Sequence, residues 1–238
     1  MIDLHCHLLP AVDDGARDIA ESMALVRAAH ASGITGAVVT PHIHPGTFDN
    51  NDETLIPAFA QLKAAIVAAG LDFRIRLGAE IRLHPDAILE LIERRMPMLG
   101  RLGAHDVALI EFPDGNIPRG ALQACEMLLG SGIRPVLAHP ERNKDVMRDP
   151  LRITPFVDAG CMLQLTAASI VGRFGEPALA ASHRLLAMGM ASIVATDAHN
   201  LAHRPPLLAE AREALRQLYG QGVAYRLCEE TPASIADF

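Results

Sequence analysis

The sequence lacks the features that mark a secreted, membrane-spanning or nucleic-acid-binding protein. Its four cysteines lie at long, irregular spacings, which is typical of a reduced, cytoplasmic chain rather than of a disulfide framework. The N-terminal stretch MIDLHCHLLP has neither a basic nor a long apolar segment, so we expect no secretory signal. No apolar run approaches the roughly 18 residues that a membrane-spanning helix needs. We therefore expect a cytoplasmic chain without membrane insertion.

The chain also lacks an excess of basic residues. Its net charge is −7 at pH 7, whereas proteins that bind the phosphate backbone present a basic face. We therefore expect no nucleic-acid partner. A phosphorylated substrate is still compatible with this charge, because bound divalent cations would invert the local field.

No linker rich in proline, glycine or serine interrupts the chain, so we expect residues 1–238 to form one domain. Short apolar, β-branched segments alternate with longer amphipathic ones, which favours a parallel sheet with crossover helices. Seven strands are predicted, at residues 2–4, 37–40, 73–78, 106–110, 134–138, 161–165 and 192–196. Glycines after helices and prolines at their starts predict helices at residues 16–32, 53–69, 118–132, 143–159 and 177–189, with one more after residue 206.

Seven such units favour a closed, TIM-like (β/α)7 barrel of the α/β class. The competing architecture is an open, doubly wound sheet. That fold would need a phosphate-binding glycine loop after the first strand, and the segment DLHCHLLP contains no glycine. The barrel is therefore the preferred prediction, with a site at the C-terminal ends of the strands.

Six of the seven predicted strands end at residues of the types that bind metals in proteins; only the sixth, which ends near Thr166, does not. Asp, Glu and His make up about one residue in six of the chain, so this coincidence is improbable by chance. Imidazole and carboxylate groups suit Zn²⁺, Mn²⁺ and Fe. So many ligands exceed the needs of one ion and indicate a cluster bridged by Glu80 and Glu111. The predicted ligands are His5, His7, Asp14, His42, Glu80, Glu111, His139, Asp197 and His199.

Some of these residues have simpler interpretations. In an extended strand, His5 and His7 point to the same side and can reach one ion, although an isolated pair could also be surface histidines. Asp14 is predicted as a ligand and Asp13 as a helix cap or a supporting group. A glutamate at a strand end, such as Glu111, can instead pair with an arginine.

Two arginines follow the predicted ligands closely. Arg142 comes three residues after His139, and Arg204 comes five residues after His199. A planar guanidinium offers bidentate hydrogen bonds to phosphate oxygens, so we expect these arginines to bind a phosphoryl group. The alternative is that they pair with surface carboxylates.

Cysteine-dependent phosphatase chemistry is excluded by the sequence. It needs an arginine six residues after the cysteine, and none of the four cysteines has one. The Cys6 thiol is interpreted as a packed small group rather than a nucleophile. Among the other histidines, His30 and His183 are predicted to be structural, whereas His44 and His203 lie on loops at the site face.

The motifs MIDLHCHLLPAVDDGA, TPHIHPG, GAEI, LIEFP, LAHPERN and ATDAHN occur in this order over residues 1 to about 205. Together they resemble the polymerase-and-histidinol-phosphatase (PHP) superfamily. Within it, the chain is most similar to the manganese-dependent protein tyrosine phosphatases of bacterial capsule and exopolysaccharide operons. The chain departs from that family at Ala11, where glycine is usual, and at the Leu165-Thr166-Ala167 stretch, which lacks a frequent asparagine.

The resemblance implies a distorted (β/α)7 barrel with two or three metal ions, of which manganese is expected and Fe, Zn or Co is also compatible. It implies one ion on His5, His7, Glu80 and Asp197. A second would lie on Asp14, His42 and His199, and a third on Glu111 and His139 with the bridging Glu80. It also assigns Arg142 and Arg204 to phosphate binding.

The implied activity is a phosphomonoesterase that acts on phosphotyrosine of a bacterial tyrosine kinase. Its mechanism would be in-line attack on phosphorus by a metal-bridging hydroxide. The competing functions are histidinol-phosphate phosphatase, a metal-dependent amidohydrolase and a non-catalytic, metal-bound accessory module. An amidohydrolase would not by itself require the two arginines.

Overall fold

Seven parallel runs of chain form the centre of the computed structural model, which describes all 238 residues. Three strands pair in the order β1 (Ile2–Asp3), β2 (Gly36–Val39), β4 (Arg74–Leu77). A second sheet has the order β10-β9-β8-β7-β5-β3. Its strands are β3 (His42–Ile43), β5 (Glu80–Arg82), β7 (His105–Glu111), β8 (Ile133–Ala138), β9 (Met162–Thr166) and β10 (Ile193–Ala195). The short β6 (Gly100–Leu102) pairs antiparallel with β7.

The two sheets are parts of one ring. Strands β2 and β3 lie on one continuous run, as do β4 and β5, and each run is interrupted by only two residues. Across this interruption, the amide of Glu80 donates to the Pro41 carbonyl at 3.1 Å. The first and last runs are joined where the Asp197 amide donates to His5 O (2.7 Å) and the His7 amide to Ala198 O (2.8 Å). The predicted distorted (β/α)7 barrel is therefore confirmed.

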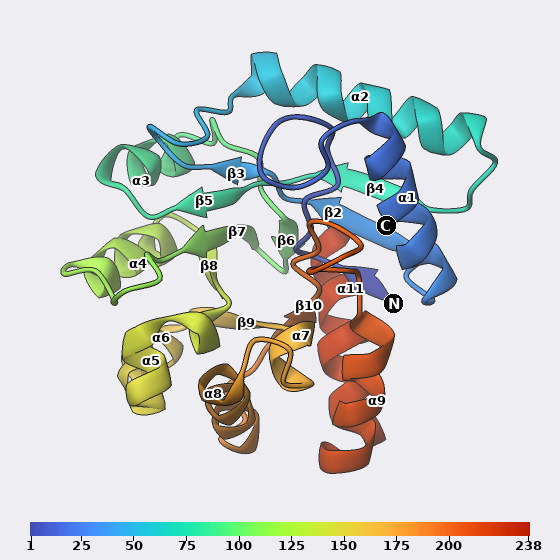
Figure 1. The fold of residues 1–238 in the computed structure, drawn as a ribbon. Helices are drawn as coiled ribbons and strands as arrows, with labels where there is room; N and C mark the ends of the chain where they lie inside the picture. The colour runs from blue at the N-terminus through green and yellow to red at the C-terminus, as the bar shows by residue number, and fades with distance from the viewer.

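Helices surround the strands on the outside (Figure 1). All seven predicted strands are present to within one residue at each end, and five of the six predicted helices form as single helices. Residues 16–32 yield α1 (Ile19–Ala31), which is capped by Asp18 rather than by Asp13 or Asp14. The longer helices that follow are α2 (Asp52–Ala68), α4 (Ala121–Gly130), α8 (Glu176–Ala187) and α9 (Leu208–Tyr219).

The predicted helix at residues 143–159 is wrong. The chain instead forms α5 (Lys144–Arg148), a 3-10 turn (Pro150–Ile153) and α6 (Thr154–Ala159). Asp149 is extended at φ −147°, because a residue before proline is disfavoured in the helical region. Asn143 does cap the first piece, as its side chain accepts from the amides of Asp145 and Val146. The sequence prediction also missed α3 (Pro85–Ile92) and α7 (Ala167–Ile170).

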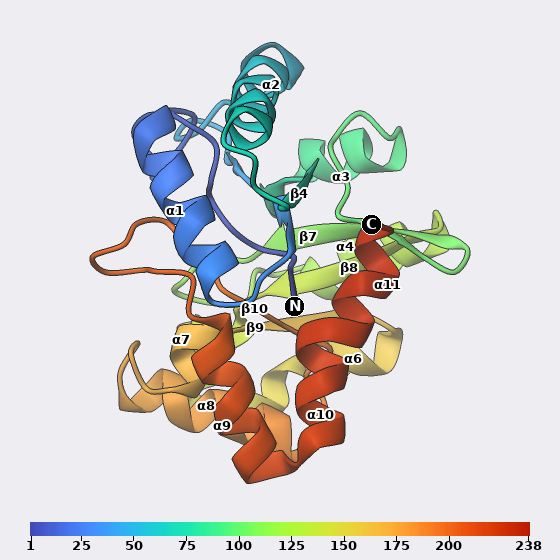
Figure 2. The same cartoon turned by 90° about the vertical axis from the view of Figure 1, so that its right-hand side faces the viewer.

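The C-terminal segment closes the barrel at the N-terminal ends of the strands. It comprises α10 (Gln221–Tyr225), a π-helical turn (Arg226–Glu230) and α11 (Thr231–Ala236). Ile235 and Ala236 belong to the smaller hydrophobic cluster inside the barrel, whereas the larger cluster lies between strands and helices. Gly100 is required here, because a Cβ atom would lie 1.9 Å from the Ile235 carbonyl oxygen. Figure 2 shows the C-terminus beside the strands, near the N-terminus. No helix is both long and apolar enough to span a membrane.

Candidate metal centre and phosphate pocket

The predicted ligands meet at the C-terminal ends of the strands. Their donor atoms form three overlapping groups, each within 4.8 Å. The groups are His5, His7, Glu80, Asp197; His7, Asp14, His42, His199; and His42, Glu80, Glu111. His139, the ninth predicted ligand, lies beside the third group, with its Nε2 atom 2.8 Å from Glu80 Oε1 and 4.0 Å from Glu111 Oε1.

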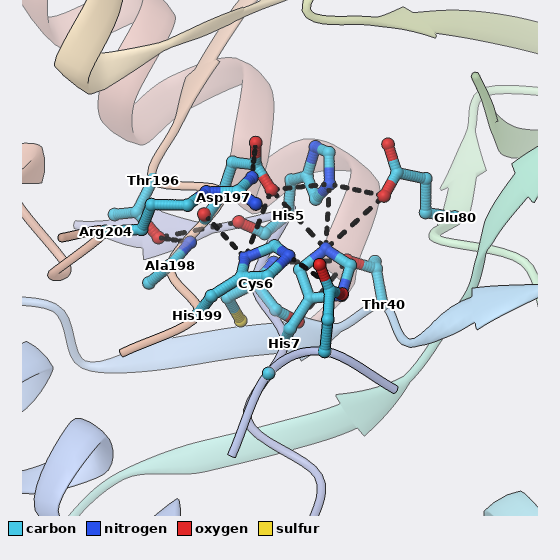
Figure 3. A network of polar contacts seen from close by, with 12 residues as sticks. His5, Cys6, His7, Thr40, Glu80, Thr196, Asp197, Ala198, His199 and Arg204 are labelled. Carbon is cyan, nitrogen blue, oxygen red and sulfur yellow. Dashed lines mark hydrogen bonds and ion pairs between the residues drawn. The ribbon is translucent and has the colours of Figure 1, made fainter. Parts of the chain in front are cut away.

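The first group is fully buried. His5 Nε2 lies 3.1 Å from Glu80 Oε2 and 3.3 Å from Asp197 Oδ1. His7 Nε2 lies 3.3 Å and 3.4 Å from the same two oxygens. Figure 3 shows both imidazoles between the two carboxylates. The prediction that residues two apart in an extended segment face one point therefore agrees with the geometry.

The second group opens to solvent. His42 Nε2 and His199 Nε2 each lie 3.3 Å from Asp14 Oδ1. The Asp14 side chain is 53% exposed, whereas that of His199 is 2% exposed. An exchangeable ligand or a substrate atom can therefore approach the cluster from the Asp14 side.

In the third group, Glu111 has two kinds of partner. Its Oε1 atom faces His139, and its Oε2 atom lies 3.0 Å from Arg82 Nε. Glu111 therefore pairs with an arginine, as the alternative interpretation said, and also belongs to the third group of possible metal ligands. Arg82 was not predicted as a site residue. Its position two residues after Glu80, in the same strand, was the available signal, since alternate residues share a face.

Several donor atoms of the cluster are buried without a hydrogen bond. Leaving such atoms unsatisfied costs about 1–3 kcal/mol each, and they are rare in native proteins. A coordinated cation would satisfy them, so the residues present fit a metal cluster. Apart from Glu111 Oε2, which faces Arg82 Nε, the atoms without a hydrogen bond are His42 Nδ1, Glu80 Oε2, Asp197 Oδ1 and His199 Nε2.

Local charges keep two carboxylates ionised despite burial. Burial alone would raise the pKa of Glu80 and that of Asp197, but neighbouring His5 and the other cationic groups hold both below their usual values. Burial and nearby Glu80 raise the pKa of Glu111. Burial, with His7 nearby, lowers the pKa of His199 to about 4. A neutral imidazole has a free lone pair for a metal.

Neighbouring acceptors orient the imidazoles. Asp13 Oδ2 accepts from His7 Nδ1 at 2.8 Å and from the His42 amide at 3.1 Å. Gln164 Oε1 accepts from His5 Nδ1 at 2.8 Å and from the His139 amide at 3.2 Å. These bonds leave the Nε2 atoms of His5 and His7 facing the cluster, a common arrangement around metal-ligating histidines.

Gln164 is the contribution of the sixth strand, which the sequence had left without a site residue. The only hint in the sequence was the amide side chain of Gln164 in the middle of the otherwise largely apolar strand MLQLT. Two roles were predicted for Asp13, a helix cap and a supporting group. Asp18 caps α1 and Asp13 binds His7, which agrees with the supporting role.

Two predicted ligands have left-handed backbones, with φ 32° at His139 and 53° at Asp197. This conformation costs a residue other than glycine about 1–2 kcal/mol. Such strain concentrates at functional sites.

Asp197 joins the cluster of predicted metal ligands to the predicted phosphate-binding arginines. Its Oδ1 atom faces His5 and His7, whereas its Oδ2 atom pairs with both Arg142 and Arg204. Arg142 ends a 3-10 turn (Pro140–Arg142) after β8, and Arg204 lies after β10; their guanidinium groups converge on one oxygen (Arg204 in Figure 3). One carboxylate thereby fixes cationic donors beside the metal-binding groups.

A cavity of about 200 Å³ lies over this junction. Arg82, Arg142 and Arg204 all line it, together with Asp14, His42, His44, Phe48, Glu80, Glu111, Asp114 and His139. His203 lines a separate, neighbouring cavity of about 570 Å³ with Asp14 and His199. The four cysteines are buried and unpaired.

Comparison with known proteins agrees with this geometry. The family model described as "Capsular polysaccharide synthesis, CpsB/CapC" matches residues 1–237. The tyrosine-protein phosphatase YwqE of Bacillus subtilis is 36% identical over 231 residues, 96% of this chain and 89% of that protein. The tyrosine-protein phosphatase CpsB of Streptococcus pneumoniae is 31% identical, over 99% of this chain and 98% of that protein.

A solved structure from work on YwqE and CpsB, described as unique metal-dependent tyrosine phosphatases, superposes with a TM-score of 0.92. It is 34% identical in sequence and covers 100% of this chain and 94% of its own. A lactonase from Listeria monocytogenes, 15% identical, superposes with a TM-score of 0.63 over 98% of this chain and 93% of its own. This second likeness concerns the fold alone.

Proposed function

The chain belongs to the CpsB/CapC family of capsular polysaccharide synthesis proteins, and we propose that it is a metal-dependent protein tyrosine phosphatase. The observation that carries the proposal is the junction at Asp197. There a cluster of metal-binding groups and two arginines share one carboxylate beside a small cavity. An amidohydrolase needs the metal-binding groups, but it does not by itself require the arginines.

We assign the metal-binding role to the nine clustered residues and expect two or three ions, with manganese as the first candidate. The four buried donor atoms of the cluster that have no hydrogen bond support this role. Bound divalent ions would lower the pKa of water and stabilise the attacking and leaving oxygens of a phosphoryl transfer. Imidazole and carboxylate ligands are also compatible with iron, zinc or cobalt.

Arg142 and Arg204 would hold the phosphoryl oxygens. Both lie at the cavity with their guanidinium groups fixed by Asp197 Oδ2. Preorganised cationic donors stabilise the charge that develops on equatorial oxygens during phosphoryl transfer. Arg82 supplies a third positive charge to the same cavity, and Glu111 restrains its guanidinium.

We propose phosphotyrosine in a protein as the substrate, in agreement with the names of the relatives. The expected partner is a bacterial tyrosine kinase of capsule or exopolysaccharide production. A tyrosine leaving group has a pKa of about 10, so it departs more readily than an alkyl alcohol. The exposed side of the cluster at Asp14 would admit a side chain presented by another protein. A single functional domain over residues 1–238 and a cytoplasmic location stay predictions.

The test compares purified, manganese-loaded protein on a phosphotyrosine peptide and on histidinol phosphate. We expect preferential turnover of the peptide, loss of turnover after chelation and recovery on addition of Mn²⁺. Preference for histidinol phosphate would favour that competing function. Full metal occupancy without turnover of either compound would favour the accessory module.

A further inference from the structure

Two of the seven phenylalanines stand outside the hydrophobic core. The other five belong to the two hydrophobic clusters or pack against them: Phe59, Phe73, Phe112, Phe156 and Phe238. Phe48 and Phe174 instead contact residues of the site. The Phe48 ring stacks on the His42 imidazole, with centroids 5.3 Å apart and planes 9° apart. The guanidinium carbon of Arg142 lies 4.6 Å from the centre of the Phe174 ring. Core packing therefore does not account for either position.

Phe48 is held at the site by a closed turn. Its amide donates to the His44 carbonyl at 2.8 Å, and the His44 amide donates back to the Phe48 carbonyl at 3.0 Å. Gly46 adopts φ 78° at the tip, and its amide donates to Asp49 Oδ1 at 2.7 Å. The Asn50 side chain ties the end of the loop to the His42 carbonyl at 2.8 Å. The half-buried Phe48 ring is thus positioned before any ligand arrives.

Phe48 is also the only hydrophobic residue among the eleven that line the cavity. An aryl phosphate has two parts with different needs, a charged phosphoryl group and an apolar ring. The arginines meet the first need. Only the Phe48 side chain offers the second part an apolar face, and aromatic rings pair favourably when offset-stacked or edge-to-face.

We propose that Phe48 determines specificity for aryl phosphates by contacting the phenyl ring of the substrate. This inference rests on the proposed function and names the residue that separates phosphotyrosine from alkyl phosphates. Phe174 does not line the cavity. Its contact with Arg142 assigns it to positioning the arginine, and thus to phosphoryl binding in general.

A simpler role for Phe48 would be to orient His42 for metal binding. Loss of that role would weaken all phosphoryl ligands equally, whereas loss of a ring contact would weaken only those with a ring. The ratio of affinities for aryl and alkyl ligands therefore separates the two roles.

The experiment measures binding of phenylphosphonate and methylphosphonate to the manganese-loaded protein by calorimetry. The wild type is compared with Phe48→Leu, Phe48→Tyr and Phe174→Leu, after metal content has been matched. We expect Phe48→Leu to weaken phenylphosphonate about tenfold, with methylphosphonate unchanged. Phe48→Tyr should keep the wild-type preference for phenylphosphonate over methylphosphonate. Phe174→Leu should weaken the binding of both compounds by a similar factor.

An unchanged affinity ratio in Phe48→Leu would overturn the inference, whether both affinities fall together or neither changes. Turnover of the phosphotyrosine peptide by the wild type is measured separately. If the wild type turns over the peptide and Phe48→Leu keeps the ratio, the inference alone fails. If the wild type neither turns over the peptide nor binds either phosphonate, both proposals fail.

Discussion

The two ends of the barrel differ in the kind of side chain that they bury. At the C-terminal ends of the strands, buried imidazole and carboxylate atoms have no hydrogen-bond partner, and His139 and Asp197 adopt left-handed backbones. At the N-terminal ends, α11 inserts Ile235 and Ala236 into an apolar cluster that excludes water. One end is therefore arranged for binding and the other for stability, a division that is usual in barrels of this type.

Asp197→Asn should have the largest effect on the binding end. The substitution removes the charge that faces His5 and His7 on one side and two arginines on the other. Asparagine tolerates the left-handed backbone, so the protein should still fold. We expect kcat/KM on a phosphotyrosine peptide to fall by about 10³-fold or more. Elemental analysis should show reduced metal content.

The matched control is Asp72→Asn, at an exposed aspartate two residues before the start of β4. Its activity should equal that of the wild type. If Asp197→Asn retained activity within tenfold of the wild type, the central role of the junction would be wrong.

Ile235→Ala tests the opposite end. Ile235 is fully buried in the barrel interior, so truncation should lower the free energy of unfolding by about 2–4 kcal/mol. Activity per folded molecule should stay within about twofold, because the residue lies at the end remote from the ligands. Urea unfolding monitored by circular dichroism measures the first quantity and steady-state kinetics the second.

Leu218→Ala is the control for this experiment. Leu218 on α9 is 62% exposed, so the free energy of unfolding of this variant should differ from that of the wild type by less than about 0.5 kcal/mol. If Ile235→Ala lost much of its activity under conditions in which it is fully folded, the two ends of the barrel would be coupled and the expectation of unchanged activity would be wrong.

Gln164→Leu should have an intermediate effect on the binding end. It removes the acceptor that orients His5 and the His139 amide. Loss of such a supporting partner typically lowers metal affinity or activity by about 10–100-fold. Gln164→Glu keeps a carbonyl-type oxygen at this position and should recover part of the metal affinity, as measured by titration with Mn²⁺. Equal behaviour of the two variants would argue against an orienting role.

Ala11→Gly should have the smallest effect. Ala11 is exposed with φ 59°, in the left-handed region that glycine adopts without strain. We expect the free energy of unfolding to rise by up to about 1 kcal/mol, and the melting temperature reports this change. A decrease in stability would indicate that the side chain makes a contact worth more than the strain.

The predictable part of the fold followed from local patterns. Short apolar strands, glycines after helices and prolines at their starts located the seven strands and most of the long helices. The helix at residues 143–159 was wrong because the prediction relied on the glycine after its end, Gly160, and neglected Pro150, which sets the backbone of Asp149. The closure by α11 was not predicted, since no local pattern says that a C-terminal helix will enter a barrel.

The same limit applies to the site. Residue types and their positions at strand ends were sufficient to predict the residues that the structure brings together and the two arginines beside them. Gln164 and Arg82 were missed, because an amide and an arginine have no distinctive meaning until their neighbours are known.

By itself, the sequence determined the chemistry available: imidazole and carboxylate groups at strand ends, arginines close behind them and a barrel to bring them together. Only the tertiary structure decided which atoms face each other. It placed one oxygen of Asp197 toward the histidines and the other toward the arginines, and it stacked Phe48 on His42. The physical reason is that donor type and strand periodicity are properties of neighbouring residues. Orientation, burial and unsatisfied hydrogen bonds arise only when residues distant in the chain pack against one another.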